Sequence, residues 1–235
     1  MIVLGIDTAS KLCEVSLFID GNIFFQKHIE LRSSENLIFW IKDLFKQNGI
    51  LPKTLDKLAV GVGPGSFTGI RVGLSMARVM SQVLKIPIMG VNYLELLEYI
   101  FLNYSDKLDK KIDFIITVMD AMRGEFYTRI YDLKNQKTLV ENQIFNLEDL
   151  MKKLSELNIY DNATIVKNYD IQKIDLKPGI NCDIFDVSME ILQEKSFFLE
   201  FASIKNNFTE YYNIKPLYIR KSFAEERREK EKNNF

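Results

Sequence analysis

Residues 2–25 read IVLGIDTASKLCEVSLFIDGNIFF, and residues 114–137 read FIITVMDAMRGEFYTRIYDLKNQK. Each stretch is an apolar run that ends in an aspartate, followed by a second run typical of a strand, a turn and a third run. The turn lies 14 residues past Asp7 in the first stretch and 15 residues past Asp120 in the second. We interpret this shared order as an internal duplication.

The segments around the two stretches alternate between helix and strand patterns. In the first half we expect helices over residues 34–48, 68–84 and 94–102 and strands over residues 58–62 and 88–91. In the second half we expect helices over residues 146–157 and 188–202 and strands over residues 164–166 and 184–187. The order predicts an α/β protein of two related halves, or lobes. We place the lobes at residues 1–106 and 107–220, with a polar junction at 107–111 and a charged tail at 221–235.

Composition limits the function. The chain has 235 residues with 31 Lys and Arg against 32 Asp and Glu, so its net charge of −1 excludes nucleic-acid binding through bulk positive charge. Its two cysteines and single histidine exclude a disulfide framework, a thiolate zinc cluster and a multi-histidine metal site. It has no signal-peptide pattern and no apolar run long enough for a membrane span, so we expect a cytoplasmic protein.

Five of the eleven glycines fall within residues 61–73, which read GVGPGSFTGIRVG. The segment has no Gly-Lys-Ser/Thr, so it is not a Walker A loop, and it lacks the third glycine of a dinucleotide fingerprint. An anion held by free N–H groups near 66–69 stays open. The alternative is close packing, because small residues recur at every fourth position: Gly69, Gly73, Ala77 and Ser81. The partner of this stripe is either the protein's own sheet or a helix of another chain.

The helix over 34–48 has an apolar face, with Trp40 at its edge and Phe39 on the opposite side. Because aromatic residues are enriched at interfaces, we take both as candidate interface residues. His28, in the third strand, is interpreted as a surface or packing histidine.

The segment from Val62 to Gly73 resembles the signature of the TsaB family, also called YeaZ. Three further matches follow in the right order: Ile6-Asp7-Thr8-Ala9, then Asp120-Ala121-Met122-Arg123-Gly124-Glu125-Phe126-Tyr127, and Lys215-Pro216-Leu217-Tyr218-Ile219-Arg220. One departure is Leu31-Arg32-Ser33-Ser34, which lacks a histidine found in many relatives.

The resemblance implies the two-lobed actin/Hsp70/sugar-kinase (ASKHA) superfold, in which each lobe is a mixed sheet with flanking helices. It implies a non-catalytic scaffold in the synthesis of N6-threonylcarbamoyladenosine (t6A) in tRNA. The implied partners are the paralogous transferase TsaD and the ATPase TsaE, a second copy of the chain when it is alone, and tRNA indirectly through the complex. The resemblance implies no intrinsic cofactor and leaves ATP or ADP at the junction with the partner open.

Two residue sets follow for testing. The expected interface is Phe39, Trp40, Gly69, Val72, Gly73, Met76, Ala77, Met80 and Ser81, so a bulky residue at Gly73 or Ala77 is expected to break the complex. The expected structural motif is Asp7, Gly63, Pro64, Gly65, Ser66, Phe67, Thr68, Asp120 and Arg123, with capping or turn roles for the two aspartates. The alternative function is a small stand-alone phosphotransferase or hydrolase using Asp7, Asp120 and the 63–69 loop, and a third is a homodimer without a catalytic partner.

Overall fold

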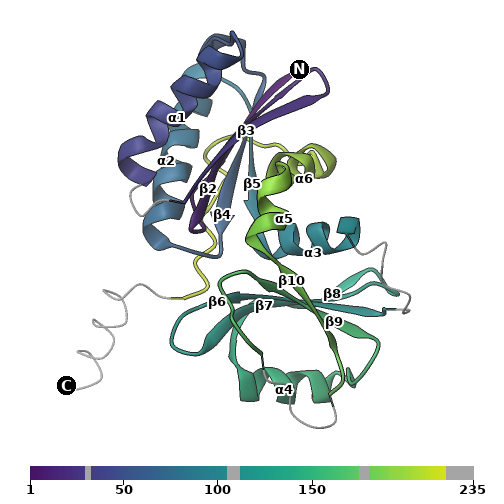
Figure 1. Ribbon diagram of the computed structural model, residues 1–235. Coiled ribbons are helices and arrows are strands. Elements are labelled where there is room, and N and C mark those ends of the chain that lie inside the picture. The colour runs from purple at the N-terminus through teal and green to yellow at the C-terminus, as the bar shows by residue number, and fades with distance from the viewer. Residues whose placement is uncertain (30–32, 105–111, 175–179, 221–235) are drawn as a thin grey trace, which may run out of the picture.

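The computed structural model describes residues 1–29, 33–104, 112–174 and 180–220 (Figure 1). The junction expected at 107–111 and the charged tail expected at 221–235 therefore lie outside the described residues.

The first sheet has the strand order β3-β2-β1-β4-β5. An antiparallel meander is formed by β1 (Ile2–Asp7), β2 (Leu12–Ile19) and β3 (Asn22–Ile29), and β4 (Lys57–Gly63) and β5 (Ile88–Asn92) run parallel to β1. Two helices cover its outer face, α1 (Ser33–Gln47) and α2 (Phe67–Leu84), and a short 3-10 turn, η1 (Pro52–Thr54), lies between α1 and β4 (Figure 1). Apart from Ile2, the residues of β1 are buried, because the strand is central and covered on both faces.

The second sheet repeats this connectivity with the order β10-β9-β6-β7-β8. The meander is β6 (Phe114–Asp120), β7 (Glu125–Asp132) and β8 (Lys137–Asn146), and the parallel strands are β9 (Ala163–Asn168) and β10 (Asp183–Val187). One helix, α4 (Leu147–Glu156), covers its outer face, with Asn146 accepting a bond from the Asp149 N–H as its N-cap. The predicted duplication and the two mixed sheets are confirmed.

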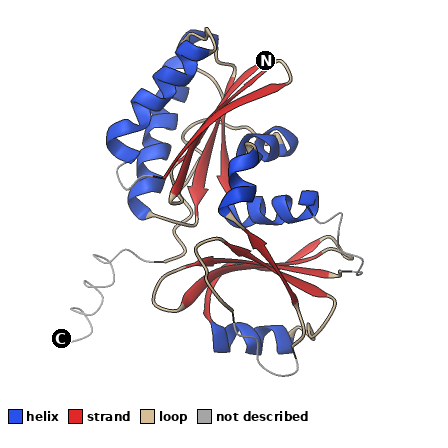
Figure 2. Cartoon of the chain, in the orientation of Figure 1, coloured by secondary structure: helices blue, strands red, loops and turns tan. Residues whose placement is uncertain are grey.

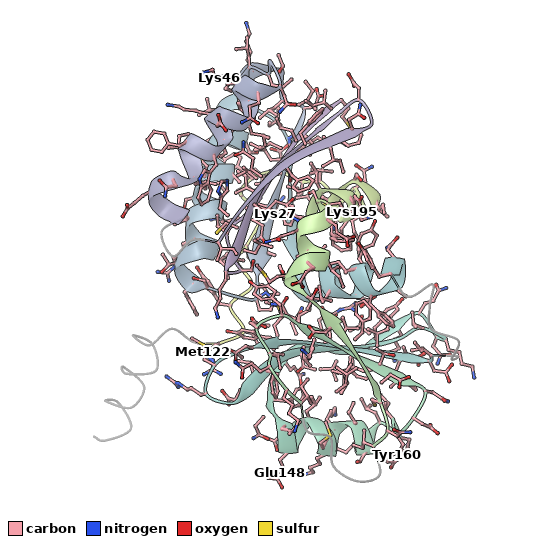
Figure 3. The ribbon with its side chains drawn as sticks, in the orientation of Figure 1. Lys27, Lys46, Met122, Glu148, Tyr160 and Lys195 are labelled. Carbon is pink, nitrogen blue, oxygen red and sulfur yellow. The ribbon has the colours of Figure 1, made fainter. Side chains whose placement is uncertain are left out.

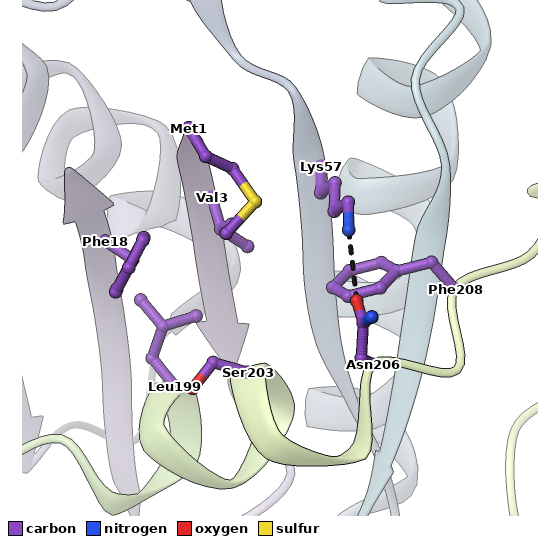
Figure 4. A pocket seen from close by; sticks show the side chains of 8 residues that line it. All are labelled: Met1, Val3, Phe18, Lys57, Leu199, Ser203, Asn206 and Phe208. Atoms are coloured by element: carbon purple, nitrogen blue, oxygen red, sulfur yellow. Dashed lines mark hydrogen bonds between the residues drawn. The ribbon is translucent and has the colours of Figure 1, made fainter. Parts of the chain in front are cut away.

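Three helices lie between the two sheets: α3 (Tyr93–Tyr104), α5 (Met189–Glu194) and α6 (Phe197–Lys205) (Figure 2). They bury one apolar cluster that takes side chains from both lobes, including Val3 and Met89 from the first sheet and Ile115 and Val166 from the second. A small cavity remains where α6 meets β1, β2 and β4, beside the bond from Lys57 Nζ to Asn206 Oδ1 of 3.0 Å (Figure 4). Its side-chain lining is mainly apolar, and it forms part of the packing of α6 on the first sheet.

The single helix expected over 188–202 is wrong, since the chain forms two helices there with a break at Lys195 and Ser196. Lys195 is extended, and the Ser196 hydroxyl accepts a hydrogen bond from Leu199 N as the N-cap of α6. The same hydroxyl donates to the buried Glu14 carboxylate of β2. The break is therefore stabilised by a distant residue, which local helix signals do not report.

The lobe boundary expected at 107–220 also needs correction, because the chain returns to the first lobe before residue 220. Helix α6 packs on β1, β2 and β5, and Thr209 forms a bridge with Ile88 at the edge of the first sheet. Ile214 belongs to the core beneath α1 and α2, and Leu217 N donates to Val62 O at 2.8 Å. Residues 197–217 are thus part of the first lobe in space.

Candidate functional site

The glycine-rich segment joins β4 to α2 and packs against the turn that follows β1. Ser66 N donates to Ala9 O at 2.8 Å, and Thr8 Oγ1 donates to Gly69 O at 2.7 Å. A Cβ at Gly65 would overlap the Ala9 carbonyl, and one at Gly69 would overlap the Thr8 carbonyl. The glycines therefore permit one backbone segment to lie directly on another.

The small-residue stripe of α2 faces the protein's own sheet. Gly69, Gly73, Ala77 and Ser81 are all buried, and a Cβ at Gly73 would overlap Thr8 Oγ1. Placing these four residues at an interface with another chain is thus wrong: Gly69 and Gly73 face Thr8, Ala77 packs in the core of the first lobe, and Ser81 Oγ donates to Ile86 O at 2.5 Å. A bulky side chain at Gly73 would disturb the fold before it reached a partner.

The two strand-ending aspartates have equivalent turn roles, as the sequence predicts. Asp7 Oδ1 accepts from Ala9 N at 3.0 Å, and Asp120 Oδ1 accepts from Met122 N at 2.8 Å. Asp7 is buried, whereas Asp120 is partly exposed. The pKa of Asp7 is raised to about 7, mainly by burial and in smaller part by the charge of Glu14, while the Ala9 N–H and Lys27 oppose the shift.

Phe67 and Arg71 hold the end of the described chain against the first lobe, and Arg220 joins it to Glu125 of β7 in the second lobe. The Phe67 ring stacks on Tyr218 with centroids 4.5 Å apart, and Arg71 Nε donates to the Tyr218 hydroxyl at 3.0 Å. Arg220 forms an ion pair with Glu125 next to the turn that contains Arg123. Arg123 has a φ of 60° and is exposed, and Thr68 is exposed in the first turn of α2. These contacts give the Lys215–Arg220 motif a structural role.

An apolar groove of about 280 Å³ lies between α1 and α2 on the outer surface of the first lobe. From α1 its lining includes Ile38, Ile41, Lys42 and Phe45. From α2 its lining includes Met76, Val79, Met80 and Val83. Val79 and Val83 are 58% and 72% exposed, which is unusual for adjacent valines on one helix turn and indicates a surface suited to a protein partner.

Of the other expected interface residues, some line or border this groove and others contact the rest of the chain. Met76 and Met80 line the groove, Val72 is half-buried one turn before them, and Phe39 is 62% exposed on α1. Trp40 is partly occupied by an internal contact, because its ring stacks on His28 of β3 with centroids 4.0 Å apart.

Sequence reasoning did not single out Val79 and Val83. The apolar spacing 72, 76, 79, 80, 83 along α2 was the available signal, and it gives a second apolar stripe beside the small-residue stripe.

The potential metal-ligating side chains of the described residues are scattered. Among them, no three His, Cys, Asp or Glu side chains are grouped so that they would hold a metal ion. Thr8 and Ala9, which follow the β1 aspartate, are bonded to the 65–69 segment, so that backbone is engaged by the protein. None of the helices in the described part of the chain has the length and apolar character that crossing a bilayer requires.

The repeated sheet topology and the helices between the sheets define a two-lobed protein of the actin-like (ASKHA) fold class with an open apolar helix face. The solved structure of YeaZ from Pseudomonas aeruginosa superposes with a TM-score of 0.68 at 19% identity, covering 92% of this chain and 100% of that chain. The predicted fold class is confirmed.

The family model described as TsaD, tRNA N6-adenosine threonylcarbamoyltransferase, matches residues 28–232. The tRNA threonylcarbamoyladenosine biosynthesis protein TsaB of Buchnera aphidicola from Schizaphis graminum is 30% identical over 205 residues, covering 83% of this chain and 95% of that protein. TsaB of Bacillus subtilis is 29% identical over 161 residues, covering 66% of this chain and 67% of that protein. The tRNA N6-adenosine threonylcarbamoyltransferase of Clostridioides difficile is 24% identical over 192 residues, covering 81% of this chain but 52% of that enzyme.

The chain belongs to the family that this model describes and, within it, to TsaB (YeaZ). Its TsaB relatives are named for tRNA threonylcarbamoyladenosine biosynthesis. The resemblance found in the glycine-rich motif is thereby confirmed.

Proposed function

We propose that this chain is the non-catalytic scaffold subunit of a tRNA t6A-modification complex. It binds the paralogous transferase TsaD through the α1–α2 face and stabilises the lobe arrangement in which TsaD is active. TsaD gains the contacts with this face only when the complex forms. If its active conformation makes more of these contacts, binding shifts TsaD toward that conformation.

The α1–α2 groove is the observation that supports this proposal most directly. Its lining is apolar except for Lys42, and the exposed valines on α2 add apolar surface that a monomer leaves in water. The match to the TsaD family model covers residues 28–232, which include α1 and α2, so we expect an equivalent pair of helices in the transferase. Two such helix pairs can pack ridges into grooves across an interface.

The same surface accounts for the other proposed assemblies. A second copy of this chain occupies the groove when TsaD is absent, and TsaE and ATP or ADP join at the junction with TsaD. The tRNA binds to the complex rather than to this chain directly, since the net charge of −1 gives this chain no general attraction to RNA. The cytoplasm, where tRNA is modified, is the compartment that fits this role.

The alternative of a stand-alone phosphotransferase or hydrolase is less well supported. The 65–69 segment lies on the turn after β1, so a polyphosphate would have to displace the Ser66–Ala9 and Thr8–Gly69 hydrogen bonds. Asp7 is buried beside Gly61 and engaged by the Ala9 N–H.

The test is co-expression of this chain with the TsaD of the same organism, followed by affinity purification and multi-angle light scattering. We expect a stable hetero-complex. A Val79→Asp/Val83→Asp double variant should be folded and should no longer co-purify with TsaD. Two separate folded species in the wild-type experiment, with nucleotide and TsaE present, would overturn the proposal.

A further inference from the structure

Lys42 is the one charged side chain that lines the apolar groove. It lies on the exposed side of α1 and extends over a surface otherwise formed by aliphatic, methionine, phenylalanine and proline side chains. Within the described residues, no hydrogen bond or ion pair joins Lys42 to another group. Among the described residues, its ammonium group therefore has no opposite charge to offset the loss of water.

Covering the groove changes the environment of this ammonium group. An ammonium that loses water without gaining an opposite charge is strongly disfavoured, even when its aliphatic stem packs well. The groove lining contains no carboxylate to compensate. The nearest acidic residue in sequence, Asp43, is engaged on the other side of α1, where its Oδ2 accepts from Gln26 at 2.9 Å and Gln47 at 2.6 Å.

We infer that Lys42 selects the partner. The TsaD surface that covers the groove carries a carboxylate opposite Lys42, whereas the groove lining of a second copy of this chain has none. The inference rests on the proposed function and names the chemistry of the TsaD surface that fits. In a symmetric pair of this chain, two Lys42 side chains would enter an interface whose lining offers no acid. The charge thus favours the hetero-complex over self-association.

The experiment compares Lys42→Met and Lys42→Glu with the wild type. Lys42→Met keeps a long apolar stem without the charge, and Lys46→Met is the matched control, since Lys46 is exposed near the outer end of the same helix and does not line the groove (Figure 3). The dissociation constant for TsaD is measured by calorimetry at low and high salt. The dimer dissociation constant of the chain alone is measured by analytical ultracentrifugation.

We expect Lys42→Met to weaken TsaD binding about tenfold and Lys42→Glu by more, with a flatter salt dependence for Lys42→Met. Self-association of the chain should become tighter in Lys42→Met, which is opposite to the expected effect on TsaD binding. The control Lys46→Met should change neither dissociation constant by more than about twofold.

Wild-type binding to TsaD that Lys42→Met leaves unchanged or strengthens would overturn the inference while the proposed function stands. Weaker self-association in Lys42→Met would overturn the part that concerns the second copy. Failure of the wild type to bind TsaD would overturn the proposed function and this inference with it.

Discussion

The Asp7 carboxyl group is buried, an environment that disfavours its charged form. Its turn role explains its presence, because its side chain holds the backbone of the turn after β1. Its pKa is raised to about 7, chiefly because burial removes water from the carboxylate and secondly because Glu14 carries a like charge. Tyr93 of α3 lies nearby, and Lys27 of β3 is the cation that partly offsets the cost.

This environment predicts a specific pH dependence. The folded chain holds the Asp7 proton up to a pH of about 7, whereas the unfolded chain releases it near the usual pKa of 3.8. Because the unfolded state binds fewer protons between these values, the free energy of unfolding contributed by Asp7 falls as pH rises through this window and is level above it.

Asp7→Asn removes that titration and keeps an oxygen that can accept from Ala9 N. We expect the variant to be more stable than the wild type at pH 8, by about 2–4 kcal/mol, and to lose this advantage near pH 4. Urea denaturation of both proteins across this range measures the difference. A difference that is constant with pH would contradict the assigned pKa.

Helix α2 shows how one element serves two purposes on opposite sides. Its small residues are packed on the β1 turn and the first sheet, and its valines and methionines border the groove. Substitutions on the two sides should therefore separate folding from association.

Gly73→Leu and Val79→Asp form a matched pair on this helix. We expect Gly73→Leu to destabilise the fold by about 3 kcal/mol or more, because its side chain meets Thr8. Val79→Asp should change the free energy of unfolding by no more than about 0.5 kcal/mol and weaken TsaD binding at least tenfold. Denaturation curves and binding assays on both variants decide this; normal stability in Gly73→Leu would mean that the stripe is not packed internally.

The same helix shows what sequence could and could not predict. Its expected span of 68–84 and the need for close backbone contact follow from local signals, namely Pro87 beyond the end and glycines at fixed spacing, and the structure adds Ser66 as the N-cap. Which surface meets the glycines does not follow, because a stripe of small residues fits any close neighbour. The α5–α6 break was missed for a related reason, since Ser196 is bonded to Glu14 far away in sequence.

At the scale of the whole molecule, a buried ion pair links the first sheet to the central helices. Lys27 Nζ lies 3.2 Å from Glu14 Oε2 and donates to Leu192 O and, at 2.6 Å, to Lys195 O. Figure 3 shows Lys27 and Lys195 close together beside α5. Both side chains of the ion pair are less than a tenth exposed, so its partners are held out of water.

Lys27→Met should therefore destabilise the protein by about 3–5 kcal/mol, because it leaves the Glu14 charge and two carbonyl groups without their cation. Adding Glu14→Gln should recover part of this loss, since the uncompensated charge is removed. Lys46→Met is the exposed control and should be neutral. Urea denaturation measures all four proteins, and a loss below about 1 kcal/mol in Lys27→Met would contradict the role of the pair.

The duplicated lobes were predictable at this scale, and the path of the chain between them was not. The two aspartate-ending runs indicate the repeat directly. The return of residues 197–217 to the first lobe depends on Thr209, Ile214 and Leu217 finding partners in β5, the first-lobe core and β4, contacts with no local pattern.

On the proposed function, this chain enables a transferase whose active site lies in TsaD. The most direct measurement is t6A formation on tRNA by TsaD with TsaE and the threonylcarbamoyl donor, without this chain, with it, and with the Val79→Asp/Val83→Asp variant. The account predicts modification only with the wild-type chain. Equal rates of t6A formation in all three reactions would contradict it.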